Sequence, residues 1–524
     1  MNNPRKRYIL SVILLLVLCL PFIIQTAVNP YYPTVDEAWQ VQAAVRLGEG
    51  KGYTASFDDT LFQSENLIDL SNVNYCHLSG WPPGYSYFIA LINLLFNNIN
   101  VSLRIVSLFF LIIGLLFWLK IGISIFNYSI KFIIFCFLLL ISAPFLRGTV
   151  LLQWSLFSII SYIVIYKDFN IRNIIITNLL LSGLVLLRYQ AIVIIPSVLI
   201  LWLLIINTRF SLLNNSKITI TKIIYLCIPI TLFVLLILWN KSNSNEISTI
   251  VTNKFHFNWM NFWIIDAISA VLLDPFLYKY LSSYIGIPVS LTIIISVFVF
   301  LVFAILLIIY RKGLFKQRFF QWGAINILFL VLFLFIIDIL FTKNQRNDWS
   351  FVGETRYYSY LYPLIYASII TLLSSFYNKF HLKISLIHKI FSVIILLSLL
   401  IILYLNKYNL NKNESKNLET ISKELNVDLN KISKDYQTNN SIVVANQPYA
   451  RILLSEGKYA VFRRIEEVLE NDNVYFSRKS LIIIVIDSND VVYLEKVKNR
   501  FLHMNRNYFF LEGKMCNYIY FLTS

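Results

Sequence analysis

Long runs of apolar residues decide what this chain can fold into. Each run approaches or exceeds the roughly 20 residues that cross a hydrocarbon core about 30 Å thick. Inside that core every backbone N–H and C=O must be paired within the segment, so the runs are predicted to be helices. Soluble domains carry about 25% charged residues, whereas this 524-residue chain carries 14% and is 57% hydrophobic. The clearest runs are Tyr8–Val28, Val101–Ile121, Ile218–Trp239, Ile287–Tyr310, Ile325–Phe341 and Ile390–Leu405.

The basic residues give these spans an orientation. A net charge of +17 could indicate a nucleic-acid partner, but the Lys and Arg residues gather in short connections between apolar runs and no RNP-like or zinc-finger pattern occurs. We therefore expect a lipid bilayer and no nucleic acid. Under the positive-inside rule the N-terminus is cytoplasmic, and an odd number of spans places the C-terminus outside. A plasma membrane is expected because no organelle signal is seen in the sequence. We predict about eleven spans, at about 8–28, 101–121, 130–146, 150–166, 173–187, 190–207, 220–239, 286–310, 320–341, 357–377 and 390–406.

The first span has an alternative interpretation. Arg5-Lys6-Arg7 followed by an apolar stretch also describes a secretory signal peptide. The stretch is longer than a typical signal-peptide core and no clear small-x-small cleavage site follows it. We therefore interpret residues 8–28 as a span.

Two parts of the chain are predicted to lie outside the membrane. Residues 29–100 form the first outer loop of a membrane domain, 1–406, and contain a short apolar stretch, Pro82–Phe96, that is typical of a helix lying along the membrane surface. Residues 407–524 are polar and alternate strand and helix patterns, which predicts a small extracytoplasmic α/β domain. The predicted strands are Ser441–Ala445, Leu481–Ile486, Tyr508–Leu511 and Tyr518–Leu522, and the helices are 414–434 and 489–502.

A pair of carboxylates, Asp36-Glu37, opens a short amphipathic helix that ends at Gly48. One interpretation is structural: Asp36 caps the helix and Glu37 favours its N-terminal dipole. The other is catalytic, because a carboxylate held at a membrane surface can remove a proton from an acceptor. The two interpretations are compatible, and both residues are candidates.

A proline turn and several arginines complete the candidate site. Pro82-Pro83 fix the entry to the following helix, and with Trp81 and the nearby His77 they either shape the fold or form one wall of a cleft. Arg147, Arg188 and Arg356 fall at predicted outer span ends, where arginine either reaches the surface or binds a lipid phosphate. The last two form Arg-Tyr pairs, Arg188-Tyr189 and Arg356-Tyr357, and we predict a phosphate clamp from them.

The order of these motifs resembles the GT-C superfamily of membrane glycosyltransferases, in particular glycosyltransferase family 39 and the related protein mannosyltransferases and aminoarabinose transferases. The resemblance covers about residues 1–380. It rests on five motifs in order: Asp36-Glu37, Gly50-Lys-Gly-Tyr53, Trp81-Pro-Pro-Gly-Tyr85, Arg188-Tyr189, and Arg356-Tyr357 before Tyr362-Pro363. Gly80-Trp81 stands where aminoarabinose transferases have Glu-Lys before the prolines, a departure that puts their lipid A acceptor in doubt for this chain.

The resemblance implies an enzyme that transfers a hexose or pentose from a polyprenyl-phosphate carrier to a glycan, lipid or protein acceptor at the outer face. It implies Asp36, with Glu37 beside it, as the catalytic carboxylate. It also implies Arg188 and Arg356, with Tyr357, at the carrier phosphate. No His/Asp cluster with ligand spacing is seen, so no cofactor is assigned, although a divalent metal could assist. The alternatives are an oligosaccharide transferase or polymerase of the same fold, a transporter, and a scaffold without activity.

Overall fold

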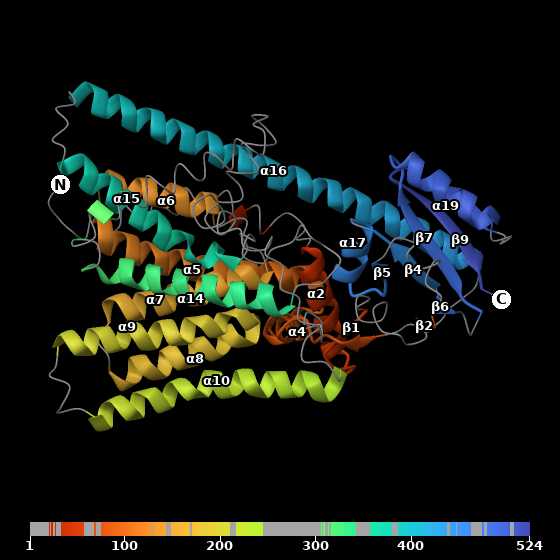
Figure 1. Cartoon of the computed structure of the whole chain (residues 1–524). Helices are drawn as coiled ribbons and strands as arrows, with labels where there is room; N and C mark the ends of the chain where they lie inside the picture. The colour runs from red at the N-terminus through yellow and green to blue at the C-terminus, as the bar shows by residue number, and fades with distance from the viewer. Residues whose placement is uncertain are drawn as a thin grey trace. The chain divides into compact units, whose positions relative to one another are not determined.

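The computed structural model of the chain is mostly helical, with a small sheet close to its C-terminal end (Figure 1). It divides into two compact units. Unit 1 comprises Met1–Ile24, Ser107–Trp239 and Ile250–Asn409, and unit 2 comprises Gln25–Val106, Asn240–Thr249 and Leu410–Ser524. Apart from a few isolated residues, the structure describes 33–56, 75–127, 129–142, 148–167, 170–209, 216–244, 316–341, 357–379, 386–436, 441–446, 448–462, 479–503 and 508–523.

Unit 1 is built from apolar helices. Three of its helical segments are long and apolar enough to cross a membrane, namely Ile99–Phe126, Gly148–Tyr166 and Ser359–Tyr377, and shorter apolar helices accompany them. Two of the predicted spans, 8–28 and 286–310, lie almost wholly outside the described residues, so the count of about eleven stays a prediction. The helices are α5 (Ile99–Phe126, which begins in unit 2), α6 (Ile130–Ser142), α7 (Gly148–Tyr166), α8 (Ile171–Leu187), η2 (Tyr189–Val193), α9 (Ile194–Arg209), α10 (Ser216–Ser244, which ends in unit 2), α14 (Arg318–Phe341), η6 (Ser359–Leu361) and α15 (Tyr362–Lys379).

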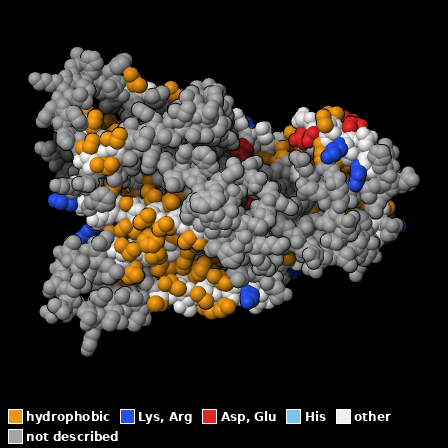
Figure 2. All heavy atoms as spheres, in the orientation of Figure 1, with side chains coloured by type: hydrophobic (Ala, Val, Ile, Leu, Met, Phe, Trp, Pro, Cys, Tyr) orange, Lys and Arg blue, Asp and Glu red, His pale blue; other side chains and the backbone are white. Residues whose placement is uncertain are grey.

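Many hydrophobic side chains among the described residues of this unit are exposed. Figure 2 shows them gathered over one face of the molecule. Such a surface would be unfavourable in water, because soluble proteins rarely expose large contiguous apolar patches. It suits contact with lipid. Exposed apolar residues on these helices include Phe109, Leu116, Ile175, Leu179, Leu235 and Leu328.

Aromatic residues fill the interior between the helices. Trp154 and Phe157 of α7 lie beside Trp118 of α5, with ring centroids 6.3 Å and 6.1 Å from that of Trp118. On the other side Phe157 stacks on Trp322 of α14 at 5.6 Å. The indole N–H of Trp322 donates to Ser161 Oγ at 2.9 Å, so the polar atom of this buried ring is satisfied.

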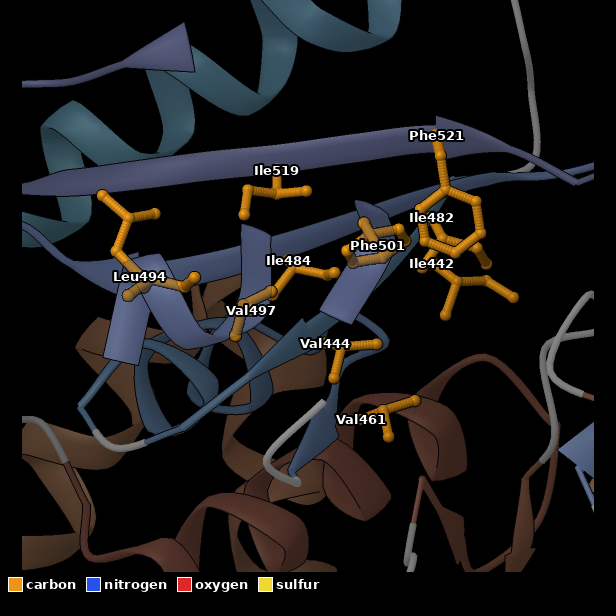
Figure 3. Packing of buried hydrophobic residues seen from close by; sticks show 11 residues of the cluster. Ile442, Val444, Val461, Ile482, Ile484, Leu494, Val497, Phe501, Ile519 and Phe521 are labelled. Carbon is orange, nitrogen blue, oxygen red and sulfur yellow. The ribbon is translucent and has the colours of Figure 1, made fainter. Parts of the chain in front are cut away.

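Unit 2 contains a mixed five-stranded sheet in the order β5-β4-β7-β9-β8. The central strands β4 (Ser441–Ala445) and β7 (Leu481–Asp487) are parallel, with β5 (Val461–Phe462) parallel to β4. The remaining strands, β9 (Cys516–Leu522) and β8 (Phe509–Glu512), are antiparallel. Helix α19 (Val491–His503) covers one face with Leu494, Val497 and Phe501 (Figure 3). This confirms the four predicted strands and the predicted helix 489–502 to within two residues.

The helix that leads into this sheet differs from the prediction. A span at 390–406 and a separate helix at 414–434 were expected, but α16 runs without a break over Leu386–Asp435. The polar segment between them contains no glycine or proline that would stop a helix. One continuous helix therefore carries the chain from unit 1 into unit 2.

The first loop completes unit 2. It contains α2 (Val35–Gly48), the short strands β1 (Thr54–Ala55), β2 (Ile68–Asp69) and β3 (Cys76–His77), and α4 (Gly84–Phe96). The helix expected at Pro82–Phe96 is thus α4, with Pro83 at its N-cap. One face of α4 is buried through Tyr85 and Ile89 and packs on α2, while Leu91, Leu94 and Leu95 are exposed. Strand β2 pairs with β6 (Val474–Tyr475), and α17 (Tyr449–Ser455) lies against α2.

Candidate active site

The two adjacent carboxylates at the start of α2 have different surroundings. Thr34 is the N-cap residue, and its backbone N–H donates to Glu37 Oε2 at 3.0 Å. The Glu37 side chain is only 4% exposed, because this bond turns its carboxylate back onto the helix start, as in a capping box. The expectation that Asp36 caps the helix is therefore wrong: Thr34 occupies the cap position, and Glu37 supplies the capping carboxylate.

Asp36 stays partly exposed. It lies in the first turn of α2, where the free N–H groups and the helix dipole favour a negative charge. Its backbone carbonyl accepts from Gln40 Nε2 at 3.2 Å. The helix thus begins with one partly exposed carboxylate, Asp36, and one buried carboxylate, Glu37.

The proline turn lies directly against α2. The ring of Trp81 lies 5.6 Å from that of Trp39 on α2, measured between centroids. Tyr53 donates its hydroxyl hydrogen to the carbonyls of Trp81 and Pro82, at 3.0 Å and 3.3 Å. Pro82 and Pro83 are buried and Trp81 is partly exposed. The turn therefore packs beside α2, the helix that carries Asp36, and its role as one wall of a cleft stays a prediction.

His77 belongs to the same neighbourhood. It lies on β3, where it pairs with Thr54 of β1, and its ring meets that of Tyr53 edge-on at 5.7 Å. His77 Nε2 lies 3.1 Å from Asn240 Oδ1, and Asn240 Nδ2 donates to the Ser79 carbonyl at 3.4 Å. Burial lowers the pKa of His77 below its usual 6.5, and the hydrogen bond to Asn240 opposes this only in part. The ring is therefore mainly neutral at pH 7.

Arg188 and Tyr357, one residue from each of the two predicted Arg-Tyr pairs, lie in unit 1. Arg188 follows the last residue of α8 in an extended conformation (φ −153°, ψ 129°), and η2 begins directly after it. Its guanidinium carbon lies 5.5 Å from the centre of the Tyr357 ring, a cation–π contact. Two segments that the sequence suggested separately, Arg188-Tyr189 and the tyrosines after Arg356, thus meet through Arg188 and Tyr357. Arg356 itself lies outside the described residues.

The structure assembles the candidates in two groups. Asp36, Glu37, His77 and the Trp81-Pro82-Pro83 turn come together in unit 2, and Arg188 and Tyr357 come together in unit 1. Within the described part of the chain, no three His, Cys, Asp or Glu side chains are grouped to hold a metal ion.

Two residues of unit 2 were not suggested by the sequence. Asn240 is buried at the end of α10 and holds His77, which is 163 residues earlier in the chain. Arg451 donates from Nε to the carbonyl of Pro33, just before α2. An isolated Asn at a span end and an Arg in a short helix carry no local signal, because the groups that they bind are distant in sequence.

Comparison with known proteins identifies solved structures that share this fold. No protein-family model matches the sequence, and no curated protein matches it significantly. The solved structure of ArnT from Cupriavidus metallidurans bound to undecaprenyl phosphate is similar over 97% of this chain and 98% of that chain, with a TM-score of 0.55 and 8% identity. The structure of ArnT from Cupriavidus metallidurans in the apo state has a TM-score of 0.52 and 10% identity, over 97% of each chain.

A third structure is more distant. The archaeal oligosaccharyltransferase AglB from Archaeoglobus fulgidus, in complex with an inhibitory peptide and a dolichol-phosphate, has a TM-score of 0.40 and 12% identity, over 92% of this chain and 69% of that chain. That score is too low to carry an argument. The similarity to ArnT covers 97% of this chain, and it shows that the chain shares the fold of ArnT, the GT-C-like fold that the resemblance implied.

Proposed function

We propose that the protein is a glycosyltransferase that moves a sugar from a polyprenyl-phosphate carrier to a hydroxyl group of an acceptor at the outer face of the membrane. A fold alone does not define an activity, so the proposal depends on the site. The observation that carries it is the separation of Asp36 from Glu37: Glu37 is buried in the helix cap, and Asp36 remains partly exposed at a fixed helix start.

The leaving group in this reaction is the carrier phosphate. Positive charge next to the departing oxygen stabilises the transition state, and the planar guanidinium group suits phosphate. We assign this task to Arg188, held by the Tyr357 ring, together with Arg356. The ArnT structure that was solved with undecaprenyl phosphate supports a carrier of this chemical class.

The acceptor hydroxyl needs a base as it attacks. Asp36 takes the hydroxyl proton, the new bond forms between the acceptor oxygen and the anomeric carbon, and the bond from that carbon to the phosphate oxygen breaks. Polyprenyl phosphate departs with the electron pair, and the direct displacement inverts the anomeric centre. Asp36 then releases its proton to water. We place the acceptor beside the neutral His77 and the Trp81-Pro82-Pro83 turn. The transferred sugar is a hexose or pentose.

Glycan profiling of a deletion strain tests the activity, because the undersized glycan that accumulates names the acceptor. Wild-type protein should restore the full glycan and Asp36→Asn should not, although it inserts in equal amount. Glu37→Gln should restore it, because the amide oxygen can still accept from Thr34 N–H. Full activity of Asp36→Asn would remove the proposed base, and failure of a folded Glu37→Gln would give Glu37 a chemical role.

The carrier site can be tested separately by binding of undecaprenyl phosphate to purified protein, measured by native mass spectrometry. Arg188→Ala should weaken binding about tenfold or more, the effect of one lost charge-assisted interaction. Arg172→Ala is the matched control, because Arg172 is exposed in the first turn of the same helix, at the end opposite Arg188. Equal binding by both variants would contradict the assignment of Arg188.

A further inference from the structure

Helix α2, which carries Asp36, is enclosed from two directions within unit 2. Its residues Ala38, Val41, Ala43 and Ala44 are fully buried. On one side it packs on α4 of the first loop, where Ser86 Oγ donates to the α2 carbonyl of Gln40 at 2.7 Å. On the other side it packs on α17 of the C-terminal domain (Figure 1). The position of Asp36 therefore depends on a domain that begins hundreds of residues later.

Gln42, in the middle of α2, forms hydrogen bonds both to the first loop and to the C-terminal domain. Its Nε2 donates to the carbonyl of Lys458, just after α17, at 2.8 Å. Its Oε1 accepts from the backbone N–H and the hydroxyl of Ser56, at 2.8 Å and 3.0 Å. The side chain is fully buried. A buried amide with its donor and acceptor both engaged fixes its helix strongly, because moving it would leave polar groups unpaired.

The turn after α17 fits closely against the last part of α2. Gly457 has φ +78°, a conformation that L side chains rarely adopt, and a Cβ added there would lie 3.0 Å to 3.2 Å from atoms of Val45. Glycine is therefore favoured here for two reasons: its backbone conformation and its close contact with Val45. The turn holds α2 at the end opposite Asp36.

Arg451 holds the end that carries Asp36. Its Nε donates to the carbonyl of Pro33, immediately before the N-cap residue Thr34. Its Nη1 and Nη2 reach Glu414 Oε1 on α16 at 3.4 Å and 3.5 Å. The Arg451 side chain is only 13% exposed, whereas that of Glu414 is 49% exposed, so the bond to the buried carbonyl matters more than the screened ion pair.

Helix α17 is in turn fixed to α16. Glu456, directly after α17, accepts from Ser422 Oγ at 2.6 Å and from Asn426 Nδ2 at 3.1 Å and 3.2 Å. The contacts therefore run without interruption from α16 through α17 to the start of α2.

We infer that the C-terminal α/β domain acts as a positioning device for the proposed base, and that Arg451 is the positioning residue that fixes the start of α2. This inference rests on the function proposed above. A base has to lie within hydrogen-bonding reach of the proton it removes, and small displacements of such a group reduce the rate strongly. Neither Arg451 nor Gly457 needs to touch substrate for this role.

The first experiment compares transfer with carrier binding in the full-length protein. Arg451→Ala should reduce product at least tenfold in the deletion strain and leave undecaprenyl phosphate binding unchanged, because the proposed carrier residues lie in unit 1. Arg451→Lys should recover part of the activity, because the lysine ammonium group can still donate to the Pro33 carbonyl. Arg500→Ala, which removes an exposed arginine from α19 of the same domain, should behave as wild type. Normal transfer by Arg451→Ala would overturn the inference.

The second experiment observes α2 directly by hydrogen exchange. In Arg451→Ala the amides at the start of α2 should exchange faster, while the β4 and β7 amides keep their protection. Unchanged exchange in α2, or a loss of protection across the whole sheet, would overturn the positioning role. This measurement needs no substrate. Faster exchange in α2 together with an active Asp36→Asn variant would therefore refute the base and leave the mechanical role standing.

A double variant separates contact from backbone strain at Gly457. Gly457→Ala should lower transfer, and adding Val45→Ala should recover part of it, since the two methyl groups nearest the new Cβ are then removed. If Val45→Ala gives no recovery, the loss arises from strain inside the C-terminal domain. The contact with α2 would then have no positioning effect.

Discussion

At the scale of single residues, neighbours in the sequence have different tasks. Asp36 and Glu37 are chemically alike, yet one carboxylate is bonded to Thr34 N–H in the helix cap and the other is not buried. The local sequence pattern nominated both residues, and only the family resemblance placed Asp36 first, because the cap depends on where the helix begins. If α2 began one residue earlier, Asp36 would occupy the N3 position that Glu37 has now. For the same reason Arg451 and Asn240 could not be found: their partners are defined only by the tertiary fold.

His77 predicts a pH dependence of stability. Burial lowers its pKa in the folded protein, so at mildly acidic pH the unfolded chain binds more protons and stability decreases. The contribution of His77 is complete above about pH 6.5 and is lost progressively below it. We expect the Tm to fall between pH 7.5 and pH 5.5, and to fall less in His77→Gln, whose amide can still donate to Asn240. Parallel melting curves of the two proteins would contradict this.

At the scale of elements, hydropathy located the helices well. The predicted spans 150–166, 173–187 and 320–341 correspond to α7, α8 and α14, whose bounds differ from the predictions by at most two residues. The apolar run itself defines each helix in a bilayer, so few other signals are needed. The prediction that the helix ends after residue 406 is wrong, because polar helix-forming residues allow α16 to continue. Polarity marks the edge of a membrane, and it does not mark the end of a helix.

Helix packing in unit 1 gives a second prediction. A Cβ at Gly114 of α5 would lie 2.2 Å from Trp154 Cζ3, whereas one at Gly183 of α8 would meet only Leu156 Cδ1 at 3.5 Å. Gly114→Ala should therefore destabilise the protein by about 1–3 kcal/mol through overpacking. Gly183→Ala should be neutral or slightly stabilising, because alanine favours a helix over glycine. Thermal unfolding in detergent distinguishes them, and equal Tm values would mean that Trp154 can move aside at little cost.

At the scale of the whole molecule, one uninterrupted helix, α16, joins the two units. A proline in its interior removes a hydrogen bond and clashes with the preceding turn, at a cost of about 3 kcal/mol. Lys412→Pro should therefore lower the Tm and speed amide exchange over residues 408–412, whereas Lys412→Ala, at the same exposed position, should not. Tolerance of the proline would mean that residues 407–413 do not need to be helical, in line with the predicted break between the span at 390–406 and the helix at 414–434.

Unit 2 also has a consequence for how the protein is made. It is assembled from three separate stretches of chain, and the bond from Gln42 to Lys458 spans 416 residues. At about 5–20 residues per second, a ribosome needs on the order of 20–80 s to deliver the second partner after the first. Throughout that time the intervening helices have to enter the membrane while α2 lacks the surface of α17. Helix α2 can therefore reach its final place only when synthesis is nearly complete, so a prematurely terminated chain would carry Asp36 without the contacts that hold it.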